Sequence, residues 1–285
     1  MTETVGTLLK GSWSYFTAHA KPILIAAVVF GVLMFGMQVV FESKTNRSME
    51  QRFGDIDQME DLAERIEDGD EEAFQEMMMQ LGIMGDSGDI DEETARKAAS
   101  DLIGNMLPMF SVFLLVMMVI TIIATTFYTV LAIEGSQDFM VTLRRVPALI
   151  LPMLGVWIWS FIRSFAWIPI IGVIFAIVLG PRLVMSSVIL IKEQKGVFES
   201  VSLSYSRSRG YWGKIVGNCI VGSLAVMLAV FVLSILVELV GTVSVTGAAI
   251  LAAALQSAAT AYGTIFIVRL TNTICANPMQ IASKK

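Results

Sequence analysis

The residue with the clearest chemical potential is an arginine, Arg182, inside an otherwise apolar run that follows Gly180 and Pro181. A charged side chain is costly within a membrane, so such residues are commonly paired or functional. Pro181 lacks a backbone donor and Gly180 lacks a side chain, which together predict a helix bend at this point. The guanidinium could then reach a carboxylate, a freed carbonyl or a lipid headgroup. A structural arginine whose head extends to the membrane surface is the alternative.

The following segment, 196–214, is rich in serine and basic residues. We expect it to lie in the membrane interface, with its apolar side chains entering the lipid, namely Phe198, Val201, Tyr205, Tyr211 and Trp212. Its cations would then lie at phosphate depth. The hypothesis is that Arg182 shares the headgroup of an anionic phospholipid with Arg207, Arg209 and Lys214.

A second group of polar residues suggests a transport path. Thr121, Thr125 and Thr129 recur every four residues, so they form one stripe along a helix. Together with a bend at Pro181 they could line a route through the membrane. Helix packing is the alternative for this stripe, as it is for the small residues Ala249, Ala253, Ser257 and Ala261.

Enzymatic chemistry finds little support in these residues. The chain has one histidine, His19, which excludes most histidine-dependent metal sites and any Ser-His-Asp triad not built on His19 itself. Beside Lys21, His19 is expected to pack at the interface. No nucleotide-binding or metalloprotease motif is present, and the basic loops lack a nucleic-acid-binding module. We therefore predict a protein that is not an enzyme and has no cofactor, catalytic residue or metal ligand, although loose cation binding by the clustered carboxylates of 42–105 stays open.

The elements that position these residues are predicted to be membrane-spanning helices. The chain has 285 residues, of which 55% are hydrophobic, and a mean hydropathy of +0.70. Several apolar runs reach the roughly 20 residues needed to cross the hydrocarbon core. The predicted fold is an all-α integral membrane protein with six transmembrane helices, at about 22–41, 107–133, 146–162, 167–190, 215–240 and 246–268.

Charge divides the chain into two parts. Residues 42–105 hold 6 Lys or Arg and 19 Asp or Glu, whereas the remainder holds 14 Lys or Arg and 6 Asp or Glu. Positive loops stay on the cytoplasmic side of a membrane. The pattern predicts a multi-pass protein of a prokaryotic plasma membrane with both termini cytoplasmic, interfacial helices on the inner face and Arg163 in an outer link.

The acidic segment would then be a small external helical cap. Its apolar residues, among them Leu62, Ile66 and Phe74, recur at helical spacing, and its last helix could continue into the second span. The predicted division is 1–41 for the inner helix and first span, 42–105 for the cap, 106–270 for the other spans and 271–285 for a cytoplasmic tail.

Residues 181–214, PRLVMSSVILIKEQKGVFESVSLSYSRSRGYWGK, resemble a known family. They are similar to the shared core of the membrane domain attached to glycerophosphodiester phosphodiesterases, which also occurs in stand-alone six-span proteins of bacteria and archaea. The matching positions are Arg182, Glu193, Gly196, Ser204, Gly210 and Trp212. The opening LLKGSWSYFTAHAKPIL also resembles that group. The resemblance implies the six-span fold but no phosphodiesterase activity, because no catalytic domain is present and the insert 42–105 departs from the pattern.

Three functions remain open at this stage. The leading one is a non-enzymatic plasma-membrane protein that binds or organises anionic lipid or assists other membrane proteins. The second is a transporter or channel-like protein, for which a deep polar cavity would argue. The third is a receptor or adaptor whose acidic cap 42–105 binds an external protein partner. The methionines and small-residue stripes would allow either a monomer or a symmetric assembly.

Overall fold

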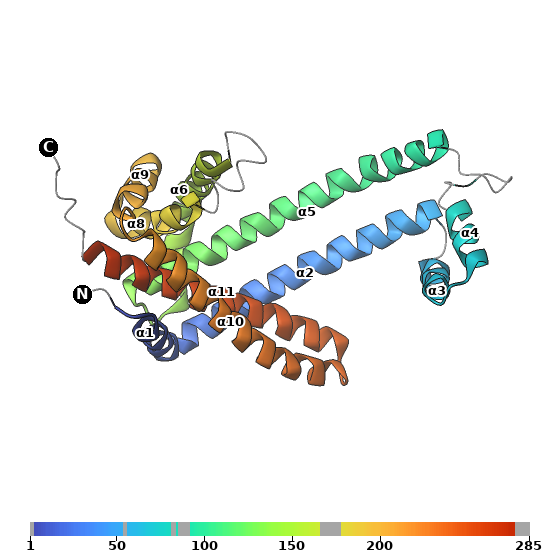
Figure 1. The fold of residues 1–285 in the computed structure, drawn as a ribbon. Coiled ribbons are helices and arrows are strands. Elements are labelled where there is room, and N and C mark those ends of the chain that lie inside the picture. The colour runs from blue at the N-terminus through green and yellow to red at the C-terminus, as the bar shows by residue number, and fades with distance from the viewer. Residues whose placement is uncertain (1–2, 54–55, 81–83, 85–91, 166–177, 277–285) are drawn as a thin grey trace. The chain divides into compact units, whose positions relative to one another are not determined.

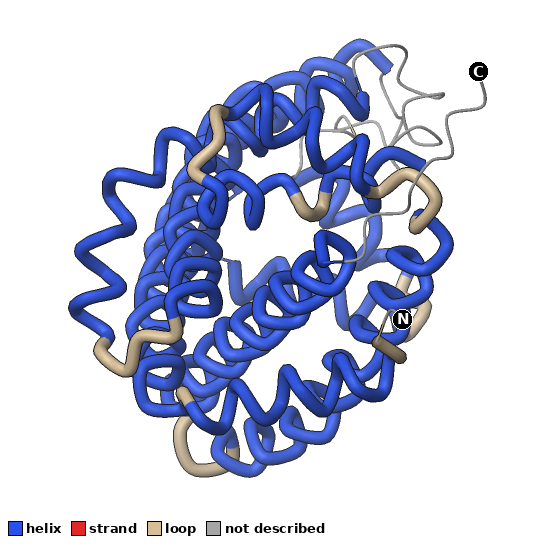
Figure 2. Tube along the Cα trace, turned by 90° about the vertical axis from the view of Figure 1, so that its left-hand side faces the viewer, coloured by secondary structure: helices blue, strands red, loops and turns tan. Residues whose placement is uncertain are grey.

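The computed structural model describes residues 3–53, 56–80, 84, 92–165 and 178–276. Within these ranges the chain is helical and contains no β-strand (Figure 2), which confirms the all-α prediction. In chain order, and as labelled in Figure 1, the helices are α1 (Val5–Ala18), α2 (Ala20–Phe53), α3 (Ile56–Glu67), α4 (Glu71–Gln80), α5 (Glu92–Glu134), α6 (Phe139–Phe165), α8 (Ser186–Glu193), α9 (Val197–Arg207), α10 (Trp212–Gly241) and α11 (Val245–Ala276).

Five of the described helices are long and apolar enough to cross a membrane. They lie at Ala20–Ser48, Met106–Glu134, Phe139–Ser164, Trp212–Gly241 and Val245–Ala276. These helices correspond to five of the six predicted spans. The remaining one, 167–190, lies largely outside the described residues.

The described part of that predicted span is interrupted. Residues 178–183 are helical, residues 184–185 form a turn, and α8 begins at Ser186. The expected bend at Gly180 and Pro181 is therefore displaced toward the C-terminus. At the turn, the Ser186 hydroxyl donates to the Leu183 carbonyl, and such local side-chain bonds compete with the helical backbone pattern.

By its contacts the chain divides into two compact units, Met1–Phe35 with Val119–Lys285, and Gly36–Met118. In the first unit, the N-terminal half of α2 packs on α5 and α11. The Phe30 ring meets the Phe127 ring edge-on at 5.9 Å, and the hydroxyls of Tyr128 and Ser257 are 2.8 Å apart. A Cβ atom built on Gly31 would lie 2.7 Å from the backbone nitrogen of Ala254. The small residues of α11 thus permit close helix packing, as expected for a packing stripe.

Two tyrosine hydroxyls connect α1 to other helices of the first unit, namely α5 and α11. The Tyr15 hydroxyl donates to the Leu131 carbonyl at 2.7 Å, and the Tyr262 hydroxyl donates to the Leu9 carbonyl at 3.1 Å. His19 stacks on Tyr15 with ring centroids 4.0 Å apart, and its Nε2 lies 3.2 Å from the Gly135 carbonyl oxygen. These contacts agree with the packing role expected of His19.

The second unit contains the acidic insert. Its α3–α4 hairpin turns at Gly69, whose positive φ of 88° suits glycine, and Leu62 is buried in it. Asp70 accepts hydrogen bonds from the first turn of α4 and pairs with Arg65 at 2.6 Å. Helix α5 is continuous from Glu92 to Glu134, which confirms that the last helix of the insert continues into the second span. The predicted boundaries at 42 and 105 fall inside α2 and α5.

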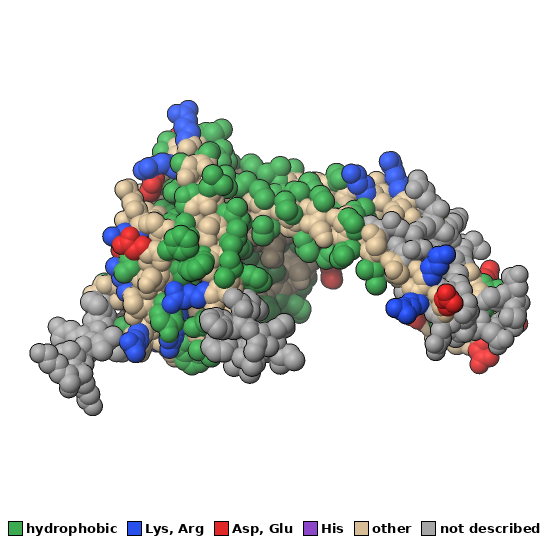
Figure 3. Space-filling view, turned by 90° about the horizontal axis from the view of Figure 1, so that it is seen from above, with side chains coloured by type: hydrophobic (Ala, Val, Ile, Leu, Met, Phe, Trp, Pro, Cys, Tyr) green, Lys and Arg blue, Asp and Glu red, His purple; other side chains and the backbone are tan. Residues whose placement is uncertain are grey.

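Apolar side chains cover much of the visible surface (Figure 3). On α10 they face outward around most of the helix, with Leu228 65% and Phe231 67% exposed. A helix that is apolar on all sides is typical of one surrounded by lipid.

Candidate functional site

The hairpin of α8 and α9 packs against α6 (Figure 1). Gly155 of α6 leaves room for Val197, since a Cβ atom at Gly155 would lie 3.0 Å from a Val197 methyl group. Further along the same two helices, the Trp159 and Phe198 rings meet edge-on at 4.8 Å. Helix α9 therefore follows the second half of α6.

This packing corrects the expectation that all apolar residues of 196–214 enter the lipid. Val201 is completely buried and Tyr211 is 7% exposed, because both face the protein interior. Phe198, in contrast, is 66% exposed. Trp212 is half-buried, and its indole N–H donates to the Val178 carbonyl at 2.9 Å.

Two arginines converge on one tyrosine at this hairpin. The Arg163 Cζ atom lies 4.8 Å from the centre of the Tyr205 ring, and the Arg182 Cζ atom lies 5.1 Å from it. The Ser204 hydroxyl donates to the Arg182 carbonyl at 2.6 Å, which fixes the stretch 178–183 against α9. Arg163, Arg182 and Tyr205 are named here the two-arginine site.

No carboxylate of the described residues pairs with either arginine of this site. The intervening stretch 166–177 contains no Asp or Glu in its sequence. The Arg182 Nε atom is buried and has no hydrogen-bond partner in the described structure. Because both Cζ atoms lie about 5 Å from one ring centre, they are no more than about 10 Å apart. Two like charges at that separation repel by about 2 kcal/mol at an effective dielectric constant near 20, so the site favours an anion.

Arg163 lies in the last turn of α6 and contacts Tyr205. An outer location for Arg163 and an inner location for the segment 196–214 are therefore incompatible expectations. The contact arises because α9 packs along α6.

Arg207 has a different environment from Arg182. Its guanidinium donates to both carboxylate oxygens of Glu193, the longer bond being 3.0 Å, and lies 3.6 Å from the Cys275 Sγ atom. Hydrogen bonding to Arg207 lowers the pKa of the Glu193 carboxyl below its ordinary value. Arg209 is exposed, and Lys214 is half-buried in the first turn of α10. Among the four predicted headgroup ligands, Arg207 is thus already paired with the Glu193 carboxylate.

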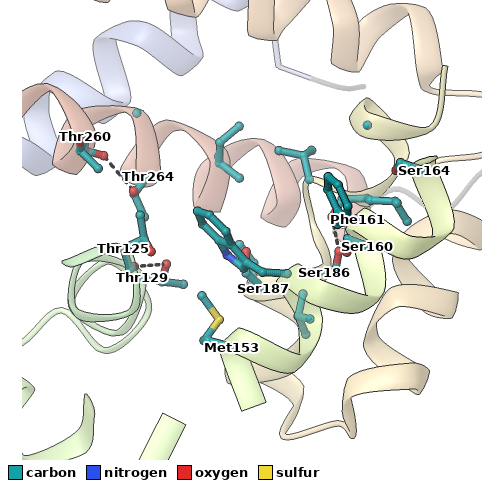
Figure 4. Close-up of a pocket in the computed structure, with 18 residues that line it drawn as sticks. Thr125, Thr129, Met153, Ser160, Phe161, Ser164, Ser186, Ser187, Thr260 and Thr264 are labelled. Carbon is teal, nitrogen blue, oxygen red and sulfur yellow. Dashed lines mark hydrogen bonds between the residues drawn. The ribbon is translucent and has the colours of Figure 1, made fainter. Parts of the chain in front are cut away.

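A pocket of about 570 Å³, with hydroxyl groups in an otherwise largely apolar lining, lies between α5, α6, α11 and residues 180–188 and is named here the hydroxyl pocket. Figure 4 shows its threonines on one side and its serines on the other. Thr125 and Thr129 line it, whereas Thr121 and Pro181 of the predicted transport path do not. Its eight hydroxyl groups belong to Thr125, Thr129, Ser160, Ser164, Ser186, Ser187, Thr260 and Thr264.

Metal-binding residues are not gathered at either site. In the described ranges, no three His, Cys, Asp or Glu side chains lie close enough to hold an ion. The hydroxyl pocket has no charged side chain in its lining.

No family model, no curated protein and no solved structure matches this chain. The resemblance of 181–214 to the membrane domain found with glycerophosphodiester phosphodiesterases therefore stays a prediction. A function has to be inferred from the site itself.

Proposed function

We propose that this chain is a non-enzymatic, multi-pass membrane protein that binds the headgroup of an anionic lipid at the two-arginine site. The observation that carries the proposal is the convergence of Arg163 and Arg182 on Tyr205 without a described carboxylate partner. Guanidinium groups bind phosphate with two parallel N–H donors, and the cation–π contacts with Tyr205 use the charge of these groups without forming a hydrogen bond.

The surroundings favour a lipid over a free phosphate ion. Phe161 and Ile162, which directly precede Arg163, are 63% and 43% exposed, and Phe198 is also exposed. An acyl chain attached to the bound headgroup would find apolar surface on these side chains. A free phosphate would gain nothing from them.

The charge of the chain supports the same proposal. The 14 Lys or Arg and 6 Asp or Glu outside 42–105 give this part a positive excess. Such an excess attracts the negatively charged headgroups of anionic lipid. The proposal accordingly includes a prokaryotic plasma membrane, cytoplasmic termini and an external segment 42–105.

Native mass spectrometry of the gently extracted protein tests this function. We expect the double variant Arg163→Gln/Arg182→Gln to retain at least about tenfold less phosphatidylglycerol than the wild type, because it loses two charge-assisted contacts. The matched control is Lys10→Gln/Arg144→Gln, which removes the same charge at two exposed residues. Equal lipid retention in both double variants would refute the proposal, and selective loss of inorganic phosphate alone would assign the site to free phosphate.

A further inference from the structure

The hydroxyl pocket has a chemistry distinct from that of the two-arginine site. It combines eight hydroxyl groups with apolar side chains such as Met153, Leu183 and Ile267, and no charged residue lines it. An ion of either sign would find no compensating charge there. The pocket therefore suits an uncharged occupant.

Most of these hydroxyls have already donated their protons to their own helices. Thr125 and Thr129 donate to carbonyls one turn earlier, each at 2.7 Å. Thr260 and Thr264 do the same at 3.0 and 2.8 Å, and Ser186 donates to the Leu183 carbonyl. Because a hydroxyl has one proton and two lone pairs, these five groups present acceptors to the pocket.

Three serines complement these acceptors. Ser160, Ser164 and Ser187 line the pocket without a hydrogen-bond partner in the described part of the chain. The Ser160 Oγ atom is buried, and an unsatisfied buried hydroxyl is costly. An occupant with its own hydroxyl groups could accept from these serines and donate to the threonines.

The pocket is bordered by aromatic residues that reach the surface. Trp157 is 40% exposed and Phe161 is 63% exposed, and both line the pocket. A volume of about 570 Å³ lies in the range of small-ligand sites but is too small for a complete two-chain lipid. The polar end of an amphiphile could enter while its chain stayed beside these aromatic rings in the bilayer.

We propose that the hydroxyl pocket binds the uncharged, hydroxyl-bearing end of a single-chain amphiphile, of the class of monoacylglycerols and long-chain alcohols. This site is separate from the two-arginine site and does not depend on it. Five hydroxyl oxygens that can only accept hydrogen bonds, three serines without a described partner and an apolar border together favour this occupant over an ion.

Photocrosslinking in detergent tests the ligand class. The probe is a monoacylglycerol with a diazirine in its chain, compared with the same probe carrying methylated hydroxyls and with the corresponding fatty acid. We expect label on peptides covering 153–164 or 180–188, competition by unlabelled monoacylglycerol, and at least about fivefold less label from either comparison probe, since hydrogen bonds are lost or a charge is introduced. Equal labelling by the methylated probe would overturn the proposal.

Gly263 offers a way to close the pocket without disturbing the fold. It lines the pocket, and a Cβ atom there would meet nothing within 4 Å, so Gly263→Leu should fill space without a clash at Cβ. Gly217→Leu is the matched control, since Gly217 has the same free space and does not line the pocket. We expect at least about a fivefold loss of label in Gly263→Leu alone.

Thermal unfolding of both variants verifies that they are folded. If Gly263→Leu is folded and labels like the wild type, the inference fails. The variant Arg163→Gln/Arg182→Gln should label normally, so failure at one site is distinguishable from failure at the other.

Discussion

Arg207 is the last residue of α9 and Arg182 lies just before α8, yet their guanidinium groups have different partners. Arg207 is bound through two nitrogens by Glu193, with side chains 32% and 28% exposed. Arg182 shares the face of Tyr205 with a second arginine, and its Nε atom has no partner among the described residues. An arginine with its own carboxylate holds the fold together, whereas a pair of arginines around a neutral ring retains its charge for an external anion.

A carboxylate introduced at the two-arginine site would remove the difference between Arg182 and Arg207 most clearly. Tyr205→Glu places a negative charge between Arg163 and Arg182, converting their environment into one like that of Arg207. We expect anionic lipid retention to fall about a hundredfold, since two contacts of about 1.5 kcal/mol each become unavailable. Native mass spectrometry measures this loss.

Tyr205→Leu is the control for the loss of the aromatic ring. It removes the cation–π contacts but introduces no competing charge, so lipid retention should fall by far less than in Tyr205→Glu. Similar retention in both variants would show that no charge competition takes place at the site.

The structural arginine should respond in the opposite way. Glu193→Ala leaves Arg207 without its carboxylate and should lower the free energy of unfolding by about 1–2 kcal/mol, between the values for exposed and buried pairs. Lipid retention should change little. Glu199→Ala is the comparison, because its partner Lys195 forms a more exposed pair, and it should give no measurable change. Chemical unfolding followed by circular dichroism measures both, and equal stability of the two variants would contradict the role given to Glu193.

The shape of the guanidinium provides a finer test. Arg182→Lys keeps the positive charge but loses the planar group that stacks on Tyr205. Lipid retention should fall about threefold, less than with Arg182→Gln. If the lysine variant retains as much lipid as the wild type, a positive charge at position 182 is sufficient and the planar guanidinium is not required.

Acid should weaken the Arg207 environment by a small amount. Since the pKa of Glu193 is lowered in the folded protein, its contribution to stability is complete above the unfolded carboxyl pKa of about 4.3. It is lost as the pH falls through the lower folded value. The difference in thermal midpoint between wild type and Glu193→Gln should therefore shrink below about pH 4. A difference that stays constant down to pH 3 would contradict this assignment.

Local patterns predicted the helices well. Five long apolar runs became span-length helices, and the continuity of α5 followed from its uninterrupted helical sequence. Residues 181–214 also contained informative positions, because Arg182 and Ser204 meet through a backbone carbonyl and Glu193 binds Arg207. Arg182, Glu193 and Ser204 are among the positions named in the family resemblance, whereas Arg207 is not.

The two-arginine site could not be predicted in the same way. Arg163 and Tyr205 belong to different helices, and their contact depends on α9 packing along α6, which Gly155 permits. The serine-rich, basic composition of 196–214 predicts an interfacial segment but gives no information about its tertiary partners. The helix break also lies at residues 184–185 and not at Pro181, next to the hydrogen bond from the Ser186 hydroxyl to the Leu183 carbonyl.

The most direct test of the central claim is the thermal unfolding midpoint in neutral detergent with added phosphatidylglycerol or phosphatidylcholine. A lipid that binds only the folded protein raises the midpoint. The account predicts that phosphatidylglycerol raises the midpoint of the wild type more than phosphatidylcholine does, and that Tyr205→Glu loses this difference while remaining folded. An equal response to both lipids in the wild type, or an undiminished preference in Tyr205→Glu, would contradict an anionic-lipid site at Arg163 and Arg182.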